Sequence, residues 1–299
     1  MIDISVILPV YNRENFLEKS LDSLEKQSFK NFELLIVDDG SSDSSCVIAE
    51  RFCDKNSNWK LFKLDHKGVS NARIYGINHS VGRYLSFVDS DDYVEPNFLE
   101  VLFNNIGNSQ ISVCNYRTQY GNSKIKIVSI WFHRSGTFSR NQMMKSLIMD
   151  LSMKSFLWNK LFDRNLFKDI FIPEMCFEDK IMCLQLFSKI EKCNITNKVL
   201  YNYHKNTSSL TWKMNEKTLD DYIKFSEFLK DFLMSTNEYK NFHISHKIFS
   251  FHVFIIIFKV LFYKYVIKNK DIMCFFEKLI YNYKRIIKSI KFKNIAKNK

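Results

Sequence analysis

Apolar runs and amphipathic segments alternate along the first 115 residues, and this pattern predicts alternating strands and helices. Five short runs rich in β-branched and aromatic residues predict strands at 4–8, 32–37, 59–64, 84–88 and 111–115. Apolar residues at three- and four-residue spacing predict helices at 15–27, 42–52 and 69–80, and a fourth that begins at Pro96. The strands are apolar almost throughout, as in parallel sheets covered on both faces. We therefore expect an α/β protein with a doubly wound, mainly parallel sheet.

The second half of the chain shows a different pattern. All seven Gly lie at or before Gly136, and Pro173 is the only Pro beyond that point. Because Gly and Pro supply most tight turns, their scarcity predicts a mainly helical second half. From Lys247 onward the pattern is helical, and 13 Lys and Arg outnumber two acids, Asp271 and Glu277. The rest of the chain is nearly neutral, so the formal charge of +12 does not indicate nucleic-acid binding by the whole protein.

Cysteine content and hydropathy limit the class of protein further. The seven Cys include no C-x-x-C pair, which favours the reduced thiols of a cytosolic protein over a disulfide framework or a zinc site. The N-terminus includes Asp3 and no early basic residue, which indicates a buried strand rather than a signal peptide. The longest apolar run of the tail, 253–258, ends at Lys259 and is far shorter than the roughly 18 to 20 residues that span a bilayer. We expect no membrane-spanning segment.

Polar clusters follow the first, second and fourth predicted strands directly. They are P-V-Y-N at 9–12, D-D-G-S-S-D at 38–43 and D-S-D-D at 89–92. Ligands of open parallel sheets bind beyond the carboxyl ends of the strands. Several carboxylates in one crevice are unfavourable without a cation, and a divalent metal is the simplest solution. Each cluster alone is also consistent with a turn or a helix cap, but three at successive strand ends indicate a binding site.

The segments 5–12, 37–43 and 87–92 together resemble the family 2 glycosyltransferases, which are inverting, nucleotide-sugar-dependent enzymes of the GT-A fold. The resemblance is strong over about the first 115 residues and continues in patches to about residue 212. It implies a GT-A catalytic domain at 1–212, followed by a helical, basic region at 213–299.

Within that catalytic domain, the resemblance implies a nucleotide-sugar-binding half at 1–115 and an acceptor half at 116–212. Pro9 and Tyr11 would line the nucleotide base, and Asp39 would accept a hydrogen bond from the uracil N–H.

The segment 68–77 resembles the family's G-x-S-x-A-R-N-x-G-I motif. By this resemblance Arg73 would face the phosphates or the sugar of the donor, for which a planar cation is suited. Ile74 stands where the family usually has Asn. The alternative for Arg73 is a solvated side chain on an ordinary amphipathic helix.

The same resemblance implies a metal site. Asp89 and Asp91 form the D-x-D element, in which Asp91 would contact Mn²⁺ or Mg²⁺ and Asp89 would point to the ribose or the sugar. Asp92 is open to either role because the run reads D-x-D-D. His204 stands in a segment that resembles the late Y-x-Y…S-x-T pattern of the family. It would be a third metal ligand or contact the diphosphate, and a structural histidine is the alternative.

The sequence Phe177-Glu178-Asp179 resembles the E-D motif that opens a helix in this family. It implies that Asp179 is the catalytic base and that Glu178 is the neighbouring acid of the catalytic pair. The alternative is a pair of acids that stabilise a helix N-terminus. Trp158, in the preceding W-N-K-L-F segment, would pack on a sugar or in the core.

These inferences predict an inverting, metal-dependent hexosyltransferase. It would move a hexose or N-acetylhexosamine from a UDP-sugar to a lipid-linked bacterial capsule, O-antigen or lipooligosaccharide glycan, with a β-linkage as the product. A sugar nucleotidyltransferase would carry a Gly-rich loop after the first strand, and a Rossmann oxidoreductase would carry G-x-G-x-x-G; the sequence has neither. A non-catalytic glycan-binding homologue would not need Asp91 and Asp179.

The basic tail at 247–299 suits the anionic surface of a membrane, because it combines lysines with amphipathic, aromatic-rich helices. The protein would then be cytoplasmic and peripheral on the inner face of the plasma membrane, without a nucleic-acid partner and with oligomerisation left open. One alternative is a helix that packs on the catalytic domain with solvated lysines. An RNA-binding arm is a weaker alternative, since no RNA-binding motif accompanies it.

Overall fold

The structure is a computed structural model that describes residues 2–120, 126–129, 135–149, 155–172, 178–205, 216–268 and 272–290. These residues form two compact units. The first unit contains the described residues up to 144, from 155 to 172 and from 178 to 205. The second contains 145–149 and the described residues between 216 and 290.

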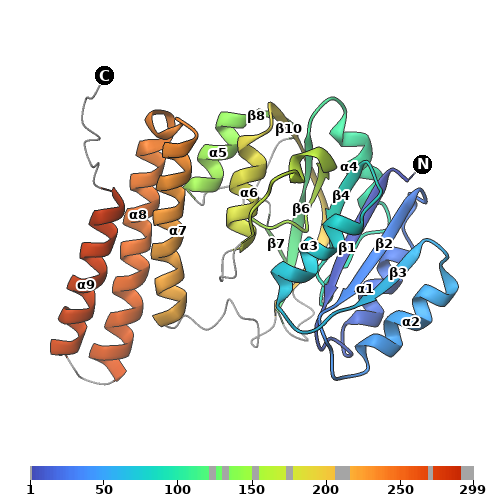
Figure 1. Cartoon of the computed structure of the whole chain (residues 1–299), viewed down its shortest axis with the longest axis horizontal. Coiled ribbons are helices and arrows are strands. Elements are labelled where there is room, and N and C mark those ends of the chain that lie inside the picture. Colours follow the sequence, from blue (N-terminus) through green and yellow to red (C-terminus); the bar gives the residue numbers. More distant parts are fainter. Residues whose placement is uncertain are drawn as a thin grey trace. The chain divides into compact units, whose positions relative to one another are not determined.

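The first unit is built on a sheet whose strand order is β3-β2-β1-β4-β9-β6-β10-β5, with β7 paired to β6 and β8 paired to β10 (Figure 1). Strands β1 to β4 pair in parallel, as do β6 and β10. Strand β9 pairs antiparallel with both β4 and β6 and so joins the two groups. The doubly wound, mainly parallel sheet predicted from the sequence is confirmed. The strands are β1 (Ile4–Val10), β2 (Phe32–Asp38), β3 (Trp59–Lys63), β4 (Tyr84–Phe87), β5 (Tyr93–Val94), β6 (Ile111–Tyr120), β7 (Lys126–Ser129), β8 (Gly136–Ser139), β9 (Lys160–Asp163) and β10 (Lys192–Lys205).

Helices pack on both faces of the central strand β1. Its even-numbered residues, from Ile4 to Val10, belong to a buried cluster with residues of α1, α2 and α4. On the opposite face, Ile7 meets α3, where a Cβ added at Gly76 would lie 2.6 Å from Cγ2 of Ile7. Glycine at this position is what allows α3 to approach the sheet. The helices of this unit are α1 (Leu17–Glu25), α2 (Ser45–Lys55), α3 (Val69–His79), α4 (Phe98–Ile106), the short 3₁₀ helix η1 (Arg164–Phe167) and α6 (Glu178–Ser188), and α5 (Arg140–Ile148) lies at its boundary with the second unit.

The prediction of a mainly helical second half is wrong for residues up to 205. Strands β7, β8, β9 and β10 all lie beyond residue 120, and β10 alone has 14 residues. Their β-branched and aromatic residues favour strands, as in the stretch from Ile195 to Tyr203. Two register shifts in β10, between Ile195 and Val199 and between Val199 and Tyr201, interrupt the alternating pattern. The helical prediction relied on the scarcity of Gly and Pro and therefore missed a strand pattern that is present but irregular.

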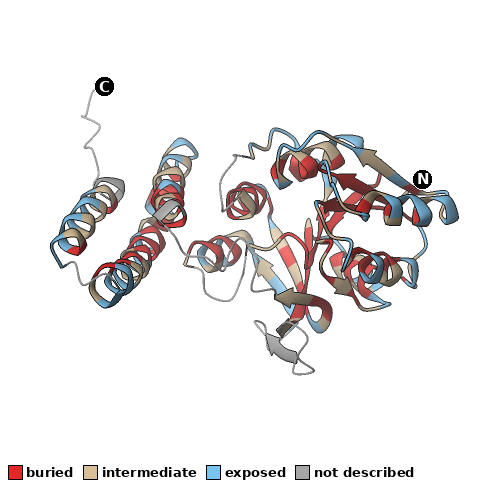
Figure 2. Ribbon diagram, turned by 90° about the horizontal axis from the view of Figure 1, so that it is seen from below, coloured by how far each residue is buried: buried red, intermediate tan, exposed pale blue. Residues whose placement is uncertain are grey.

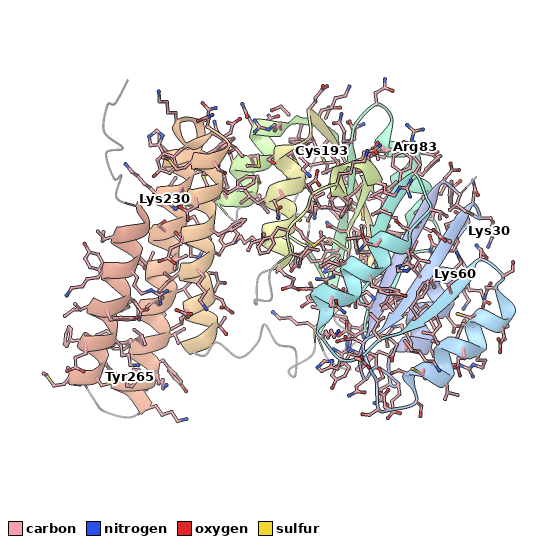
Figure 3. All side chains as sticks on the ribbon, in the orientation of Figure 1. Lys30, Lys60, Arg83, Cys193, Lys230 and Tyr265 are labelled. Atoms are coloured by element: carbon pink, nitrogen blue, oxygen red, sulfur yellow. The ribbon has the colours of Figure 1, made fainter. Side chains whose placement is uncertain are left out.

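The second unit is helical, which confirms the expected C-terminal extension. It contains α7 (Glu216–Ser235), α8 (Tyr239–Leu261), which continues as the π-helical segment η3 (Phe262–Lys268), and α9 (Ile272–Ile290) (Figure 1). A buried polar cluster joins α7 to α8, since Oγ of Ser226 lies 3.3 Å from Nε2 of His246 and 3.0 Å from Oγ of Ser250. Tyr265 marks the η3 end of α8 in Figure 3.

The continuous helix of α8 and η3, Tyr239–Lys268, is long and apolar enough to cross a membrane by length and composition, with a mean hydropathy of 1.7. The sequence had led us to expect no such segment, because Lys259 interrupts its longest apolar run. Only 28% of the most apolar window is buried in the protein, and pale blue, exposed positions recur along α8 in Figure 2. Much of the apolar surface of this helix therefore faces outward.

Candidate active site

The three polar clusters lie at one edge of the sheet. In the parallel register, Val10 at the end of β1 is opposite Asp38 at the end of β2, and Phe87 at the end of β4 is opposite Ile7. The N–H of Asp39 donates to the carbonyl oxygen of Val10 at 2.8 Å. The strand register thus brings together the segments that the sequence analysis singled out, at the edge where open parallel sheets bind ligands.

Asp39 holds the loop that leads into α3. Its buried carboxylate accepts hydrogen bonds from the N–H groups of Lys67 and Gly68, both at 2.9 Å, and lies 2.8 Å from Nδ1 of His66. Oδ1 accepts only one of these bonds, so it retains a lone pair for a ligand N–H. The predicted contact between Asp39 and a nucleobase is therefore compatible with its structural role.

Tyr11 presents an aromatic surface beside Asp39. The residue is 41% exposed, and its ring stacks on His66, with ring centroids 4.1 Å apart. Pro9 lies buried in β1, two residues before Tyr11. Sequence reasoning missed His66, although its position just before the Gly68 motif was a usable signal. Together these residues form a flat aromatic surface next to a hydrogen-bond acceptor.

Arg73 connects three segments of the site. Its Nη1 donates to Oε1 of Glu178 at 2.9 Å, and its Nη2 donates to Oδ1 of Asp89 at 3.3 Å. The side chain is buried, so the alternative of a solvated arginine is wrong. Burial lowers the pKa of Arg73, but the nearby carboxylates of Asp89, Asp179 and Glu178 outweigh it and raise that pKa. The guanidinium is thus a permanent cation that orients two carboxylates.

Asp179 and Glu178 form the first turn of α6, where acids interact favourably with the helix dipole. Burial, together with the charges of Glu178 and Asp89 and against the opposing charge of Arg73, raises the pKa of Asp179 to about 7. A carboxylate with a pKa near neutrality is suited to accept a proton at physiological pH. Phe177, the third residue of the predicted motif, lies outside the described residues.

Asp91 and Asp92 of the D-S-D-D run differ in their surroundings. Both oxygens of Asp92 are bonded within the protein: Oδ2 accepts from the hydroxyl of Tyr201 at 2.8 Å and Oδ1 accepts from the N–H of His204 at 2.6 Å. The side chain of Asp91 is 22% exposed, and its Oδ2 lies 3.7 Å from Nε of Arg13. Burial and the charge of Asp89 raise the pKa of both Asp91 and Asp92, and Asp91 adds to this effect at Asp92.

His204 lies beside this run. Its ring packs on Phe16, with centroids 5.2 Å apart, and it is close enough to Asp91 to lower the pKa of that carboxyl. Within the described ranges, no three His, Cys, Asp or Glu side chains are grouped so that they could hold a metal ion. Magnesium is commonly bound by one or two carboxylates together with substrate phosphates. The partly exposed carboxylates of Asp89 and Asp91 fit an ion of that shared kind.

Two residues that support the site received no role from the sequence. Tyr201 is fully buried, and its hydroxyl also accepts a hydrogen bond of 3.1 Å from the N–H of Asp89. Trp158 stacks on Tyr201, with ring centroids 4.2 Å apart, and is buried, so of its two predicted places it occupies the core.

The second residue that supports the site is Lys160, which is fully buried and donates to Oδ1 of Asn159 at 2.7 Å.

Burial lowers the pKa of Lys160, and the nearby groups that oppose this include Cys193, labelled in Figure 3, and Asp179. Lys160 is therefore a buried amine close enough to interact electrostatically with the candidate base. Trp158 and Lys160 both belong to the W-N-K-L-F segment, so its resemblance to the family could have indicated that they matter to the site.

Comparison with known proteins identifies the class. Residues 5–171 match the model of glycosyl transferase family 2, and the chain belongs to this family. Its fold is the GT-A fold: a crystal structure of S. aureus TarS superposes with a TM-score of 0.74 at 20% identity, over 97% of this chain and 81% of that one.

The relatives known from sequence are glycosyltransferases by name. The glycosyltransferase GlyA of Streptococcus pneumoniae is 34% identical over 72% of this chain, which spans only 32% of GlyA. The cholesterol galactosyltransferase of Borreliella burgdorferi is 29% identical over 70% of this chain and 62% of its own length.

Proposed function

We propose that this chain is an inverting glycosyltransferase that uses a UDP-sugar as donor. The observation that carries this proposal is Asp179, a carboxyl whose pKa is raised to about 7 at the start of α6, with Arg73 and Asp89 beside it. Family membership supports the reaction class. A UDP donor is supported by the crystal structure of S. aureus TarS in complex with UDP-GlcNAc, which superposes with a TM-score of 0.65.

In the proposed reaction, Asp179 accepts the proton of an acceptor hydroxyl while the hydroxyl oxygen attacks the anomeric carbon of the donor. The bond between that carbon and the diphosphate oxygen breaks, and UDP leaves from the opposite face. An α-linked donor then gives a β-linked product. Arg73 keeps Glu178 and Asp89 in place, so that their charges hold the pKa of Asp179 in the range where it can act as a base.

On the donor side, Tyr11 and Pro9 would line the uracil, and the free lone pair of Asp39 would accept its N–H. Asp91, with Asp89 and His204 beside it, would hold Mn²⁺ or Mg²⁺ together with the diphosphate. Asp92 would fix the conformation of the D-S-D-D run through its hydrogen bonds with Tyr201 and His204. A divalent ion bound there would neutralise negative charge on the departing diphosphate. Residues 1–115 would bind the donor and 116–212 the acceptor, with 213–299 as a separate helical region.

We further propose that the transferred sugar is a hexose or N-acetylhexosamine and that the acceptor is a growing, lipid-linked surface glycan such as a capsule, O-antigen or lipooligosaccharide. The protein would act in the cytoplasm at the inner face of the plasma membrane, attached through its basic tail at 247–299. The 11 excess positive charges of this tail support attachment to an anionic surface.

The test is release of UDP from a panel of UDP-hexoses and UDP-N-acetylhexosamines, with and without Mn²⁺. The proposal expects one donor to be hydrolysed slowly without acceptor, and Asp179→Asn to suppress this release. Asp163→Asn, at the end of β9, is the matched control. UDP-sugar binding without any turnover would instead support a non-catalytic homologue, and release of diphosphate from a nucleoside triphosphate would support a nucleotidyltransferase.

A further inference from the structure

The outer side of α8 carries an apolar stripe that the fold leaves exposed. Apolar residues recur along it at alternating spacings of four and three positions, which keeps them on one side of the helix for about five turns. The stripe consists of Ile244, Ile248, Phe251, Ile255 and Phe258 on α8 and Phe262 at the start of η3; all but Ile255 are exposed, and Phe251 is 64% exposed. The opposite side of α8, which includes Phe242 and Phe249, is buried. The helix is therefore apolar on two sides, and within the described residues the outer side is covered only in part, where Phe258 and Phe262 contact Phe275.

Helix α9 extends this stripe into a wider face. Its exposed residues include Ile272, Met273, Phe276, Ile280 and Tyr283. The two helices meet through aromatic contacts: Phe275 lies 5.6 Å from Phe258, and Tyr283 lies 5.7 Å from Phe254, measured between ring centroids. Phe258 and Tyr283, one exposed residue of each helix, thus lie at the seam where α8 and α9 meet. We call these eleven residues the apolar face.

Positive charges border the apolar face. Lys247 and Lys259 on α8 and Lys284 on α9 are all exposed. Long lysine side chains can lie along apolar surface and place their charge at a membrane headgroup. A second copy of this chain would bring like charges together, whereas an anionic bilayer complements them. Charge therefore favours lipid as the occupant of the face.

Packing against α7 decides how α8 meets the lipid. The buried side of α8 is joined to α7 through Ser226 and His246, and α9 is tied to α7 by the ion pair of Arg285 with Asp220. Helix α7 also carries Lys224, whose side chain is 55% exposed. If α8 crossed the bilayer with this packing intact, charged residues of α7 would enter the hydrocarbon, which is unfavourable. An interfacial helix immerses only one side.

We propose that the apolar face lies in the interface of an anionic membrane, with α8 and α9 parallel to its plane and α7 on the aqueous side. This inference rests on the membrane partner of the proposed function and names the surface and orientation that serve it. Lipid would bind the apolar face by burial, and the bordering lysines would add a salt-sensitive attraction. The continuous helix of α8 and η3, which is long enough to span a bilayer, would instead lie parallel to the membrane surface.

The test is co-sedimentation of the full-length protein with vesicles of equal parts phosphatidylglycerol and phosphatidylcholine. Phe251→Gln with Phe276→Gln leaves the charge unchanged and should lower the partition coefficient about 100-fold, since each buried aromatic contributes roughly tenfold or more. Lys259→Gln with Lys284→Gln should weaken binding at low salt and matter little at high salt. Val47→Gln, at an exposed valine of α2, is the control and should bind as the wild type.

Orientation is tested with tryptophans at Ile244, Ile255 and Phe262, read by the quenching of their fluorescence by brominated lipids. Helices that lie flat give similar quenching at all three positions, whereas deep quenching at Ile255 alone would show a spanning helix and overturn the proposal. Absence of vesicle binding at low salt would also overturn it. So would a dimer in sedimentation velocity that depends on Phe251 and Phe276 while vesicles are not bound, because the face would then belong to a second copy.

These measurements are independent of catalysis. A protein that binds vesicles but releases no UDP would reject the enzymatic proposal alone, and one that turns over a soluble acceptor without binding vesicles would reject the membrane proposal alone.

Discussion

The hydroxyl of Tyr201 bridges two ends of the D-S-D-D run: it donates to Oδ2 of Asp92 at 2.8 Å and accepts from the N–H of Asp89 at 3.1 Å. Because Asp92 also accepts from the N–H of His204, the run is fastened to β10 at two points. Its conformation therefore depends on a buried strand, and the network leaves the side chains of Asp89 and Asp91 partly exposed.

Tyr201→Phe should keep the fold and lower activity. Removing the hydroxyl leaves a buried carboxylate oxygen and a backbone N–H without this partner, which costs about 1–3 kcal/mol. We expect the Mn²⁺ concentration for half-maximal UDP release to rise and the melting temperature to fall by several degrees. Tyr84→Phe, at a buried tyrosine outside the site, is the control. Unchanged metal dependence in Tyr201→Phe would show that the bridge does not position the run.

Asp91 and Asp92 should respond differently to the loss of charge. Asp91→Asn should remove the stimulation by Mn²⁺, because this partly exposed carboxylate would contact the ion. Asp92→Asn should mainly lower stability, because its oxygens are bonded to Tyr201 and His204. Isothermal titration with Mn²⁺ and UDP, together with thermal melts, separates the two effects. Full activity in EDTA would contradict the metal assignment altogether.

The pH dependence of transfer should report Asp179. A general base must be ionised, so with a pKa of about 7 the value of kcat/KM should fall about tenfold per unit as pH drops below 7. Asp179→Asn should lower kcat by about 10² to 10⁴ and abolish this acidic limb. UDP affinity should barely change, since the base contacts the acceptor. If Glu178→Gln removes the limb and Asp179→Asn does not, the base has been assigned to the wrong carboxylate.

Arg73→Met should destabilise the protein strongly. It leaves the carboxylates of Glu178 and Asp89 without their buried cation, and breaking a buried pair on one side costs about 3–5 kcal/mol. Combining it with Glu178→Gln should recover part of this loss, because one uncompensated charge is then removed. Urea denaturation followed by circular dichroism measures both. Equal stability of Arg73→Met and the wild type would show that the pair is not coupled to folding.

Gly76→Ala should disturb the packing of α3 on the sheet. The added methyl would lie 2.6 Å from Cγ2 of Ile7, and overpacking of this kind costs about 1–3 kcal/mol. Ile7→Ala should relieve the clash in the double variant. Gly136→Ala is the matched control, because the nearest atom to its new Cβ would be 3.8 Å away. A loss of stability as large in Gly136→Ala would point to backbone flexibility rather than packing.

The sequence predicted the first half of the sheet well because its strands are continuous apolar runs separated by amphipathic helices, which is a strong local signal. It failed for β10, where register shifts around Val199 break the alternation and the pairing partners are distant in sequence. The motifs located Asp89, Arg73 and Glu178 individually. Their contact depends on three separate segments meeting, and no local pattern encodes that Arg73 bonds both carboxylates.

The buried cluster of Ser226, His246 and Ser250 has a consequence for the behaviour of this protein in acid. Burial, with a contribution from Lys230, lowers the pKa of His246 to about 4, against a hydrogen bond from Nε2 of His246 to the carbonyl oxygen of Ser226 that raises it. The unfolded C-terminal helices therefore bind a proton at His246 more readily than the folded ones. The free energy of unfolding of these helices falls as pH drops from about 6.5 towards 4. Asp179 acts in the opposite sense: because its pKa is raised to about 7, the folded first unit, which contains the sheet, binds a proton more readily than the unfolded chain, and this contribution to its stability rises as pH drops below about 7. Mild acidification should thus loosen the C-terminal helices while the sheet unit stays folded, as two separate unfolding transitions in calorimetry would show.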